Sequence, residues 1–342
     1  MRSSCTDLKG TEWTINMAII RKISVVVVTA LLTACQQPAE PSFVKVVPSA
    51  VIETRDGPTQ AELDRKTQVV VLGTGTPIPD AHRAGSSIAV IHKGEAYLFD
   101  IGAGAIQNAI TARYKYDIPS LYPSQICCVF LTHMHSDHTL DFSELAATLW
   151  WRSRAPLSAW GPVGLEQMTN GMAEMMAPDT ALRTGGSQPV QDSAAREIEV
   201  TEIDEGIVFQ KDDLTVEAFA VNHGKIKPAY GYKITTADRS IVISGDTAFS
   251  EKLLEKSRGV DLLFHEVISD SGLAGNTEFW QNYHKSSHTL ASELGKLASE
   301  ARPGLLVLYH GLFYGVPEAT IVDEVRTSYD GEVVLADDLD LF

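Results

Sequence analysis

Cysteine is scarce in this sequence, and its few positions give no basis for a disulfide-stabilised fold. Four cysteines occur among 342 residues, and Cys5 and Cys35 lie close to the N-terminus. Cys127 and Cys128 are neighbours in an apolar run with the character of a β-strand. Side chains alternate between the two faces of a strand, so we expect this pair to be two small core residues. The sequence therefore predicts no disulfide framework.

Basic residues are also in short supply. The chain has 28 Lys and Arg against 44 Asp and Glu, which gives a formal net charge of −16, and no stretch gathers the basic residues into a stripe. A nucleic-acid backbone is bound chiefly by clustered Lys and Arg, and a strongly acidic surface repels it. The composition therefore does not favour nucleic acid as the partner.

Long apolar runs are absent apart from one near the N-terminus. Arg21 and Lys22 precede apolar residues 23–32, a run that is too short to span a bilayer but suits a secretory signal. The run ends in Leu-Thr-Ala-Cys, which resembles a bacterial lipobox with Cys35 as the lipidated residue. We therefore predict a lipoprotein signal over residues 1–35, a lipid anchor to the membrane and a periplasmic location. A short buried helix with an ordinary cysteine is the alternative.

The limits of the signal and of the folded domain follow from composition. Translation from Met17 would give a signal of conventional length, so the choice between Met1 and Met17 stays open. Residues 36–66 contain four prolines among polar residues and no sustained apolar period, which indicates a flexible tether. We predict that the folded domain comprises residues 67–342.

Apolar runs typical of buried strands alternate with helical stretches in this domain. Residues 140–151 and 289–301 place apolar side chains on one helical face. Residues 168–197 have the least regular pattern and are interpreted as a mobile cover over one edge. The alternation predicts an α/β fold with polar residues at the strand ends. The predicted strands comprise residues 69–72, 87–91, 96–100, 127–132, 157–160, 214–221, 230–235, 240–244, 261–265, 305–309 and 332–336.

The strongest functional signal is a cluster of metal ligands at the end of one strand. Residues 133–138 read His-Met-His-Ser-Asp-His, directly after the apolar run Val-Phe-Leu-Thr. Alternation places His133 and His135 on one face, and the following turn brings Asp137 and His138 back toward the same point. Imidazole and carboxylate groups suit zinc or a similar first-row ion. A surface turn that merely happened to contain these histidines would bring together groups that repel one another when protonated.

This motif after a buried strand resembles the metallo-β-lactamase superfamily, and the resemblance extends over residues 68–342. It implies an αββα sandwich, in which two mixed sheets pack face to face with helices outside. Other ligand positions of the superfamily match His223, which precedes a Gly-Tyr strand, Asp246, in Ser-Gly-Asp-Thr, and His310, at the end of a late apolar strand. The implied ligands of one metal ion are His133, His135 and His223, those of the second are Asp137, His138 and His310, and Asp246 bridges the two.

The resemblance also implies the chemistry of the site. Two ions about 3.5–4 Å apart share a hydroxide, lower its pKa and stabilise both the attacking and the leaving oxygen. We expect two divalent ions, Zn²⁺ first and Mn²⁺ or Fe as alternatives. The expected reaction is attack of a metal-bridging hydroxide on a small sulfate or phosphate ester. Asp100, in Phe-Asp-Ile-Gly, resembles the aspartate that supports the cluster in the superfamily, and a turn-capping carboxylate fits it equally well.

A narrower resemblance leads to the branch that contains the tRNA 3′-processing endonucleases and a group of zinc arylsulfatases. Its signs are a Gly-Thr-Gly-Thr-Pro opening, a His-Glu pair after a strand and a His-Thr pair before a helix. By this resemblance Asp137, Glu266 and His288 are catalytic, with His288 protonating the leaving oxygen and Glu266 orienting it. His284, one helical turn earlier, is the rival of His288, and helix capping is the structural alternative.

Departures from that branch favour a small substrate over RNA. Gly-Leu-Phe-Tyr-Gly after His310 replaces the Ser-x-Arg-Tyr of the tRNA enzymes, and their Gly- and Lys-rich arm is not visible in residues 150–206. We therefore predict a dinuclear ester hydrolase, similar to an arylsulfatase or a phosphodiesterase. The alternatives are a tRNA 3′-processing endonuclease of the ribonuclease Z type, a lactonase or β-lactam hydrolase, and a non-catalytic lipoprotein that binds metal or an anion.

Aromatic residues offer candidates for a substrate pocket. We expect two or three of them to contact substrate and the others to lie in the core. Members of this branch often dimerise, and the sequence leaves a homodimer open. The candidates are Trp150, Trp151, Trp160, Phe249, Trp280, Tyr283, Phe313 and Tyr314.

Overall fold

The computed structural model describes residues 57–342 except 64, 154, 187–188 and 191–192. The chain divides into two units, Met1–Lys45 and Val46–Phe342, and the described residues all belong to the second. The predicted signal and most of the predicted tether lie outside the described residues. The described part of the tether contains one helical turn, α1 (Gln60–Leu63). No described helix is both long and apolar enough to cross a membrane.

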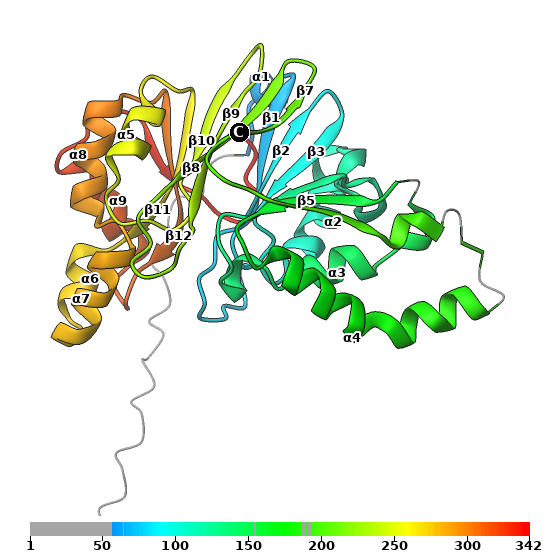
Figure 1. Cartoon of the computed structure of the whole chain (residues 1–342). Coiled ribbons are helices and arrows are strands. Elements are labelled where there is room, and N and C mark those ends of the chain that lie inside the picture. The colour runs from blue at the N-terminus through cyan, green and yellow to red at the C-terminus, as the bar shows by residue number, and fades with distance from the viewer. Residues whose placement is uncertain (1–56, 64, 154, 187–188, 191–192) are drawn as a thin grey trace, which may run out of the picture. The chain divides into compact units, whose positions relative to one another are not determined.

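Two mixed β-sheets pack face to face, which confirms the αββα prediction (Figure 1). The first sheet contains six strands in chain order, with antiparallel pairing from β1 to β3 and parallel pairing from β3 to β6. Its strands are β1 (Thr67–Gly73), β2 (Ser87–His92), β3 (Glu95–Phe99), β4 (Cys128–Phe130), β5 (Leu157–Gly161) and β6 (Ile198–Glu202).

The second sheet has seven strands in the order β13-β12-β11-β10-β9-β8-β7. Pairing is antiparallel from β7 to β10 and parallel from β10 to β13. Its strands are β7 (Gly206–Lys211), β8 (Leu214–Ala220), β9 (Tyr230–Thr235), β10 (Ser240–Ile243), β11 (Leu262–Ile268), β12 (Leu305–Leu312) and β13 (Val333–Leu335).

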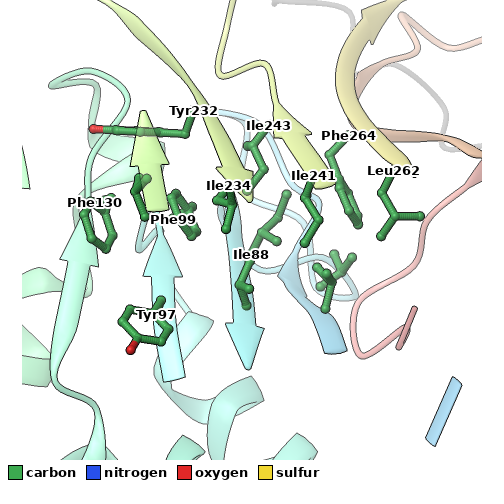
Figure 2. Close-up of a cluster of buried hydrophobic side chains, with 14 of the residues drawn as sticks. Ile88, Tyr97, Phe99, Phe130, Tyr232, Ile234, Ile241, Ile243, Leu262 and Phe264 are labelled. Carbon is green, nitrogen blue, oxygen red and sulfur yellow. The ribbon is translucent and has the colours of Figure 1, made fainter. Parts of the chain in front are cut away.

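The main hydrophobic core lies between the two sheets. Figure 2 shows Ile88 and Phe99 of the first sheet close to Ile234 and Ile241 of the second, and all four side chains are buried. Strands covered on both faces are apolar at successive positions, which explains the continuous apolar runs in the sequence. Burial of one such side chain contributes about 1.5–3 kcal/mol to folding.

Helices cover the outer faces of the sheets. Side chains of α2, α3 and α4 enter the apolar cluster outside the first sheet, and those of α5, α8 and α9 enter the cluster outside the second. The α-helices are α2 (Ala105–Tyr116), α3 (Phe142–Ala147), α4 (Leu165–Gly185), α5 (Glu251–Ser257), α6 (Asp270–Ala274), α7 (Glu278–Ser287), α8 (Ala291–Ala301) and α9 (Glu318–Arg326). The 3-10 turns are η1 (Pro119–Leu121), η2 (Pro123–Gln125), η3 (Ser136–His138), η4 (Trp150–Arg152) and η5 (Ser193–Arg196).

Four of the described elements differ from the sequence prediction. The segment interpreted as an irregular cover is largely α4, which buries only Leu165 and Thr169 and therefore has no sustained apolar stripe. Strands β6 and β7 were not predicted, because neither contains a buried residue and so neither has a buried apolar run. The helix predicted over residues 140–151 is the shorter α3 followed by η4.

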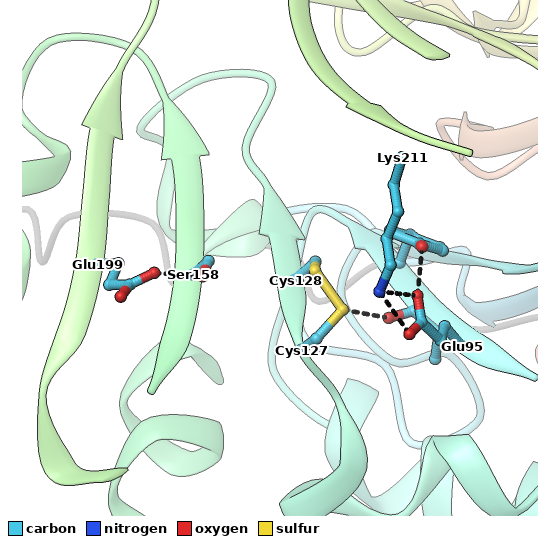
Figure 3. The surroundings of a disulfide bond; sticks show 8 residues. Glu95, Cys127, Cys128, Ser158, Glu199 and Lys211 are labelled. Atoms are coloured by element: carbon cyan, nitrogen blue, oxygen red, sulfur yellow. Dashed lines mark hydrogen bonds and ion pairs between the residues drawn. A yellow bond between two sulfur atoms is a disulfide. The ribbon is translucent and has the colours of Figure 1, made fainter. Parts of the chain in front are cut away.

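The cysteine prediction was wrong. Cys127 and Cys128 are joined by a disulfide bond (Figure 3). The expected alternation applies only within a strand, and β4 begins at Cys128, so Cys127 still belongs to the preceding loop. Its side chain is therefore not held on the opposite face of the strand.

Candidate metal centre

All seven predicted metal ligands meet at one edge of the sandwich. Strand β4 leads through Leu131 and Thr132 into residues 133–138, and β10 leads through Ser244 and Gly245 into the bridging aspartate. The remaining two ligands come from β12 and from the turn after β8. The ligand side chains form two four-membered groups that share Asp246. These groups are His133, His135, His223 and Asp246, here called the first position, and Asp137, His138, His310 and Asp246, here called the second position.

The first position has the spacing of a metal site. His135 Nδ1 lies 2.9 Å from His133 Nε2 and 3.2 Å from His223 Nε2. Asp246 Oδ2 lies 3.8 Å from His133 Nε2 and 3.9 Å from His223 Nε2. Ligand atoms roughly 2.0–2.1 Å from a tetrahedral zinc ion lie about 3.3 Å from one another. The four ligand atoms therefore surround one point at distances that suit a first-row ion.

The second position has similar spacing and is completed by the other oxygen of Asp246. Asp137 Oδ2 lies 3.1 Å from His310 Nε2 and 3.4 Å from His138 Nε2. Asp246 Oδ1 lies 3.3 Å from His138 Nε2 and 3.6 Å from His310 Nε2. One carboxylate thus presents one oxygen to each position, which is the arrangement of a bridging ligand.

Buried polar atoms without hydrogen-bond partners test whether the site fits metal ions. Asp137 Oδ1, His138 Nε2 and Asp246 Oδ1 are buried and have no such partner among the described residues. Buried polar atoms are nearly always satisfied in folded proteins, and an unsatisfied one is costly. Divalent cations bound by His138 Nε2, Asp246 Oδ1 and the carboxylate of Asp137 would remove that cost, so the donor set fits two metal ions.

Asp100 orients the second position, as the resemblance suggested. It follows β3, and its Oδ2 accepts a hydrogen bond from His138 Nδ1 at 2.7 Å. The same carboxylate accepts hydrogen bonds from the backbone N–H and the hydroxyl of Thr132, both at 2.8 Å. A proton held on Nδ1 leaves His138 Nε2 free to bind metal. Asp100 therefore joins strand β4 to the ring of one ligand.

The histidines of the first position are oriented by groups that the sequence did not indicate. His133 Nδ1 lies 2.9 Å from the Thr132 hydroxyl, and His223 Nδ1 donates to the backbone carbonyl of Ser287 at 2.9 Å. Each hydrogen bond fixes the ring tautomer that directs Nε2 toward the metal. The backbone carbonyl leaves no trace in a sequence motif, whereas Thr132 was visible as the residue before the motif.

Glycines allow the segments around the ligands to approach closely. A Cβ atom at Gly102 would lie 2.1 Å from the Asp137 backbone oxygen, and one at Gly85 would lie 2.8 Å from it. Gly245 has φ +59°, and a Cβ there would lie 2.7 Å from the Tyr230 backbone oxygen. These positions accept only glycine without movement of the backbone that carries Asp137 and Asp246.

The electrostatics of the first position favour neutral imidazoles. Burial lowers the pKa of His133 well below its usual value, and the neighbouring His138 lowers it further. Burial likewise lowers the pKa of His135 and of His223. These three side chains therefore offer lone pairs to a metal at neutral pH.

At the second position the pKa values of the histidines shift in the opposite direction. Burial opposes a charge on His138, but the carboxylates of Asp246 and Asp100 outweigh burial and raise its pKa well above the usual value. The pKa of His310 is also raised, against burial, by Asp246 and by its hydrogen bond to Asp137. Burial alone would raise the pKa of Asp137, yet the adjacent rings of His138 and His310 hold it well below its usual value. Without metal, this position is therefore an ion-paired cluster.

Glu266 and His288 lie beside the metal ligands, as predicted. Glu266 is fully buried on β11, its Oε1 accepts hydrogen bonds from the backbone N–H groups of Thr247 and Thr289, both at 3.1 Å, and His288 Nδ1 lies 3.3 Å from this oxygen. Glu266, His288 and His310 each have a ligand-type atom within 4.8 Å of the others. Burial raises the pKa of Glu266 well above its usual value and lowers that of His288 to about 4.

His284, the alternative to His288 as the proton donor, lies farther from the metal ligands than His288 does. It hydrogen-bonds through Nε2 to the Tyr314 hydroxyl, and its ring centre lies 5.5 Å from that of His288. The ring of His288, in contrast, lies 5.3 Å from that of His223 and 6.1 Å from that of His310. The geometry therefore favours His288 over His284 as the group nearest the ligands. His288 is the C-terminal cap residue of α7, whereas the capping role predicted for it, at the start of the following helix, belongs to Leu290.

The candidate aromatic residues separate into two groups. Trp160 packs in the core against Phe130, and Trp150 lies buried beside α3 and α4. Trp280 and Tyr283 are exposed on α7, where both rings contact His284. Tyr314 also contacts His284, so these three candidates lie on the side of the metal centre that carries His288.

A two-sheet sandwich with this ligand set at its edge defines the fold and site of a β-lactamase-type metallohydrolase. The beta-lactamase superfamily domain matches residues 96–311 of the sequence, and the chain belongs to the metallo-β-lactamase superfamily. Ribonuclease Z of Mycobacterium sp. (strain KMS) is 30% identical over 277 residues, which cover 80% of this chain and 94% of the relative. Ribonuclease Z of Mycobacterium marinum (strain ATCC BAA-535 / M) is 29% identical over 283 residues, with coverage of 80% and 96%.

Solved structures share the fold at low sequence identity. The metallo-β-lactamase fold protein YhfI from Bacillus subtilis has a TM-score of 0.61 and 19% identity, and the match covers 81% of this chain and 100% of that one. The short form of human tRNase Z has a TM-score of 0.57 and 23% identity, with coverage of 80% and 98%. Zn²⁺-bound PqqB from Methylobacterium extorquens has a TM-score of 0.59 and 17% identity, with coverage of 80% and 99%.

Proposed function

We propose that this protein is a phosphodiesterase that depends on two divalent metal ions, zinc in the first instance. The observation that carries the proposal is Asp246, whose two oxygens face two separate sets of ligand atoms at distances between 3.3 and 3.9 Å. A metal pair held in this way supplies an activated water and positive charge for the oxygens of the ester. The ligand set of five imidazoles and two carboxylates suits zinc and also accepts manganese or iron.

The side chains around the ligands provide proton transfer. Glu266, with its raised pKa, holds a proton at neutral pH, and His288 is neutral beside it at 3.3 Å. In the proposed reaction the proton moves from Glu266 to His288 Nδ1, and His288 gives the proton on its other nitrogen to the departing alkoxide. The buried pair thus acts as one acid even though the pKa of His288 alone is low.

The relatives favour RNA as the substrate over the small esters that the sequence suggested first. Two of them are named ribonuclease Z and align over at least 94% of their own length, so the chain retains nearly the whole extent of an RNA phosphodiesterase. Cleavage of precursor tRNA at its 3′ end is therefore the first specific candidate. Sulfate esters have no support of this kind.

A small phosphodiester is the second candidate, and one observation favours it. Residues 162–206, which include α4 and β6, contain nine acidic residues and only two basic ones. An RNA backbone requires clustered Lys and Arg, and this segment would repel it. A small anionic diester, in contrast, needs positive charge only at the metal centre itself.

The N-terminal prediction remains part of the proposal. Lipidation of Cys35 would hold the enzyme at the periplasmic face of a membrane, apart from the precursor tRNA of the cytoplasm. Radiolabelled palmitate incorporated into the wild-type chain, but not into Cys35→Ser, would support the anchor. An unlabelled, unprocessed chain in the cytosolic fraction would contradict the anchor and favour the RNA substrate.

One comparison of substrates tests the proposal. The full chain, loaded with zinc and separately with manganese, is assayed on a precursor tRNA with a 3′ trailer, on bis(4-nitrophenyl) phosphate and on 4-nitrophenyl sulfate, with Asp246→Ala as the blank. Hydrolysis of either phosphodiester above the blank is expected, and preference for the tRNA would assign the ribonuclease activity. Hydrolysis of the sulfate alone, or of none of the three, would contradict the proposal.

A further inference from the structure

We propose that α7 carries a stacking platform for a planar ring on the leaving group of the substrate, flanked by lysines that attract its negative charge. The platform consists of Phe279, Trp280 and Tyr283, here called the α7 aromatic face, and its flank consists of Lys225, Lys227 and Lys285, here called the lysine rim. This inference rests on the proposed phosphodiesterase function. It assigns a class of leaving group, an alcohol or phenol that bears an aryl ring or a nucleobase.

The α7 aromatic face is unusual because it is exposed. Among the described residues five aromatic side chains of Phe, Tyr or Trp are exposed, and three of them are on this one helix. Trp280 is 48% exposed, and its ring contacts that of Phe279 at 5.5 Å and that of Tyr283 at 5.7 Å, both edge-on. Edge-on contacts between neighbours leave ring faces uncovered, and a flat ligand can stack on such faces.

Ring contacts connect this surface to the metal centre. The Trp280 ring stacks on His284 with centroids 5.8 Å apart and an angle of 26°, and His284 lies next to His288. The Tyr283 ring also contacts His284, at 5.0 Å. The candidate proton donor therefore lies between the aromatic face and the ligands. Since the donor must reach the leaving oxygen, the remainder of the leaving group extends toward α7.

The His284 ring is held in place from the other side. Its Nε2 hydrogen-bonds to the hydroxyl of Tyr314, which follows β12 with φ +49°. Its ring is buried, and it stacks under Trp280. A fixed ring beneath an exposed indole pre-organises the indole face, so less rotational freedom is lost when a ligand stacks on it.

The lysine rim lies on the same side of the centre. Lys225 and Lys227 are exposed in the turn that follows His223, and Lys285 is exposed on α7. Gly224 in this turn packs against Ser286 and Ser287 at the end of α7, so the two segments are adjacent. None of the three lysines forms an ion pair with another described residue, whereas four of the other eight described lysines are paired with a carboxylate.

The chemistry of the two features selects the ligand. Unpaired ammonium groups attract an anionic diester, and exposed aromatic faces stack on a planar ring, whether an aryl group or a base. The first turn of α7 contains one acidic residue, Glu278. An apolar but non-planar leaving group would gain little from the platform, because stacking requires a flat partner.

The test uses leaving groups that differ in planarity but little in basicity. The zinc-loaded full chain is assayed on methyl benzyl phosphate and methyl cyclohexylmethyl phosphate, and on a dinucleotide with either a base or no base on the leaving ribose. Trp280→Ala should lower kcat/KM for the ring-bearing member of a pair roughly 10-fold and leave the other member unchanged. Trp280→Phe should restore most of this loss, and Tyr114→Ala, an exposed aromatic on α2, should change neither.

The two arms identify the source of the ring. An effect in the benzyl pair alone indicates an aryl ester, and an effect in the dinucleotide pair indicates a nucleotide. If the wild type hydrolyses these diesters but Trp280→Ala affects both members of each pair equally, or neither, the platform is overturned and the phosphodiesterase function stands. If the wild type hydrolyses none of the four, the proposed function fails and the platform fails with it.

The lysine rim has a separate test in the same assay. The triple variant Lys225→Gln, Lys227→Gln, Lys285→Gln should lower kcat/KM at low ionic strength. It should also flatten the dependence of kcat/KM on salt, because the lysine charges that salt screens in the wild type are no longer present. Lys296→Gln, an exposed lysine on α8, serves as the control. An unchanged salt dependence in the triple variant would remove the lysines from the proposal.

Discussion

The two proposed metal positions share one carboxylate but differ in charge and in exposure. The first position adds three imidazoles to Asp246, and His135 among them is partly exposed. The second adds two imidazoles and the carboxylate of Asp137, and all of these are buried. The pKa values of the histidines are lowered in the first position and raised in the second.

This difference shows that one set of ligands can form two metal positions with different electrostatics. Neutral imidazoles at the first position are ready for a metal at neutral pH, whereas the second position is held together by ion pairs that a metal must replace. The exposed edge of His135 also indicates that solvent and substrate reach the first position more directly. We therefore expect the two positions to respond differently to mutation and to pH.

Loss of the shared ligand should have the largest effect. Asp246→Ala removes one ligand atom from each position, so bound metal should fall at both and hydrolysis should fall to the level of the blank. Metal content by mass spectrometry of the native protein, together with the diesterase assay, measures both. Asp330→Ala, which removes only an exposed ion pair with Arg302, is the matched control. Full activity in Asp246→Ala would show that the two positions are not coupled through this carboxylate.

Removal of the proposed proton donor should separate chemistry from metal binding. His288→Ala should lower kcat on diesters with poor leaving groups by about 10²–10⁴-fold, because general acid catalysis is lost. Metal content at both positions should not change, since His288 contributes to neither. Rates on a 4-nitrophenyl diester, whose leaving group needs no proton, should fall much less. An equal loss on both classes of substrate would exclude the acid role.

Asp100→Asn should affect the second position selectively. An amide in place of the carboxylate loses the charge that favours a proton on His138 Nδ1, and such supporting residues are worth about 10–100-fold in metal affinity or activity. Competition with a chelator should therefore reveal one weakened site and one of normal affinity. Two equally weakened sites would mean that Asp100 supports the whole edge of the sheet through Thr132 and not one position.

The two positions should also differ in their dependence on pH. At neutral pH His138 and His310 hold protons that a metal must displace, so affinity at the second position should rise with pH by up to about tenfold per unit for each proton released. Affinity at the first position should stay nearly flat above pH 6.5, because its histidines, with lowered pKa values, are already neutral. Calorimetric titration with zinc in buffers of different ionisation enthalpy counts the protons.

The stability of the metal-free protein should show the opposite trend. A histidine whose pKa is raised by folding contributes stability that is fully present below its unfolded value of 6.5. This contribution is lost as the pH rises through the raised value, so metal-free protein should melt at a lower temperature at pH 9 than at pH 7.5, a range in which the histidines with lowered pKa values are neutral in both the folded and the unfolded chain. Thermal unfolding in the presence of a chelator measures the change, and a rise in stability over this range would contradict the raised pKa of His138.

Much of the centre was predictable because its chemistry restricts residue types. Metal binding requires residues such as His and Asp, so residues 133–138 stand out at the end of an apolar strand, whereas Asp246 and the role of each ligand came from the resemblance to the superfamily. The sandwich followed from alternating apolar runs, since buried strands must be continuous in apolar residues. Strands β6 and β7 contain no buried residue and lack that signal.

The remaining features depend on contacts that no local pattern records. His284 and Tyr314 lie 30 residues apart, and nothing in either segment indicates their hydrogen bond. Asp100 supports His138 only because β3 and β4 are neighbours, so its role could not be chosen from sequence. The exposed face of α7 has the same composition as a buried one, and its exposure becomes visible only when the packing is known.

Crystallography with zinc tests the dinuclear centre most directly. Anomalous diffraction from crystals of the zinc-loaded protein should give two peaks about 3.5–4 Å apart, with one oxygen of Asp246 bound to each. The peak at the first position should persist when crystals are grown at pH 6, and the peak at the second should lose occupancy. A single peak, or two peaks that Asp246 does not bridge, would contradict the dinuclear centre on which the proposed function depends.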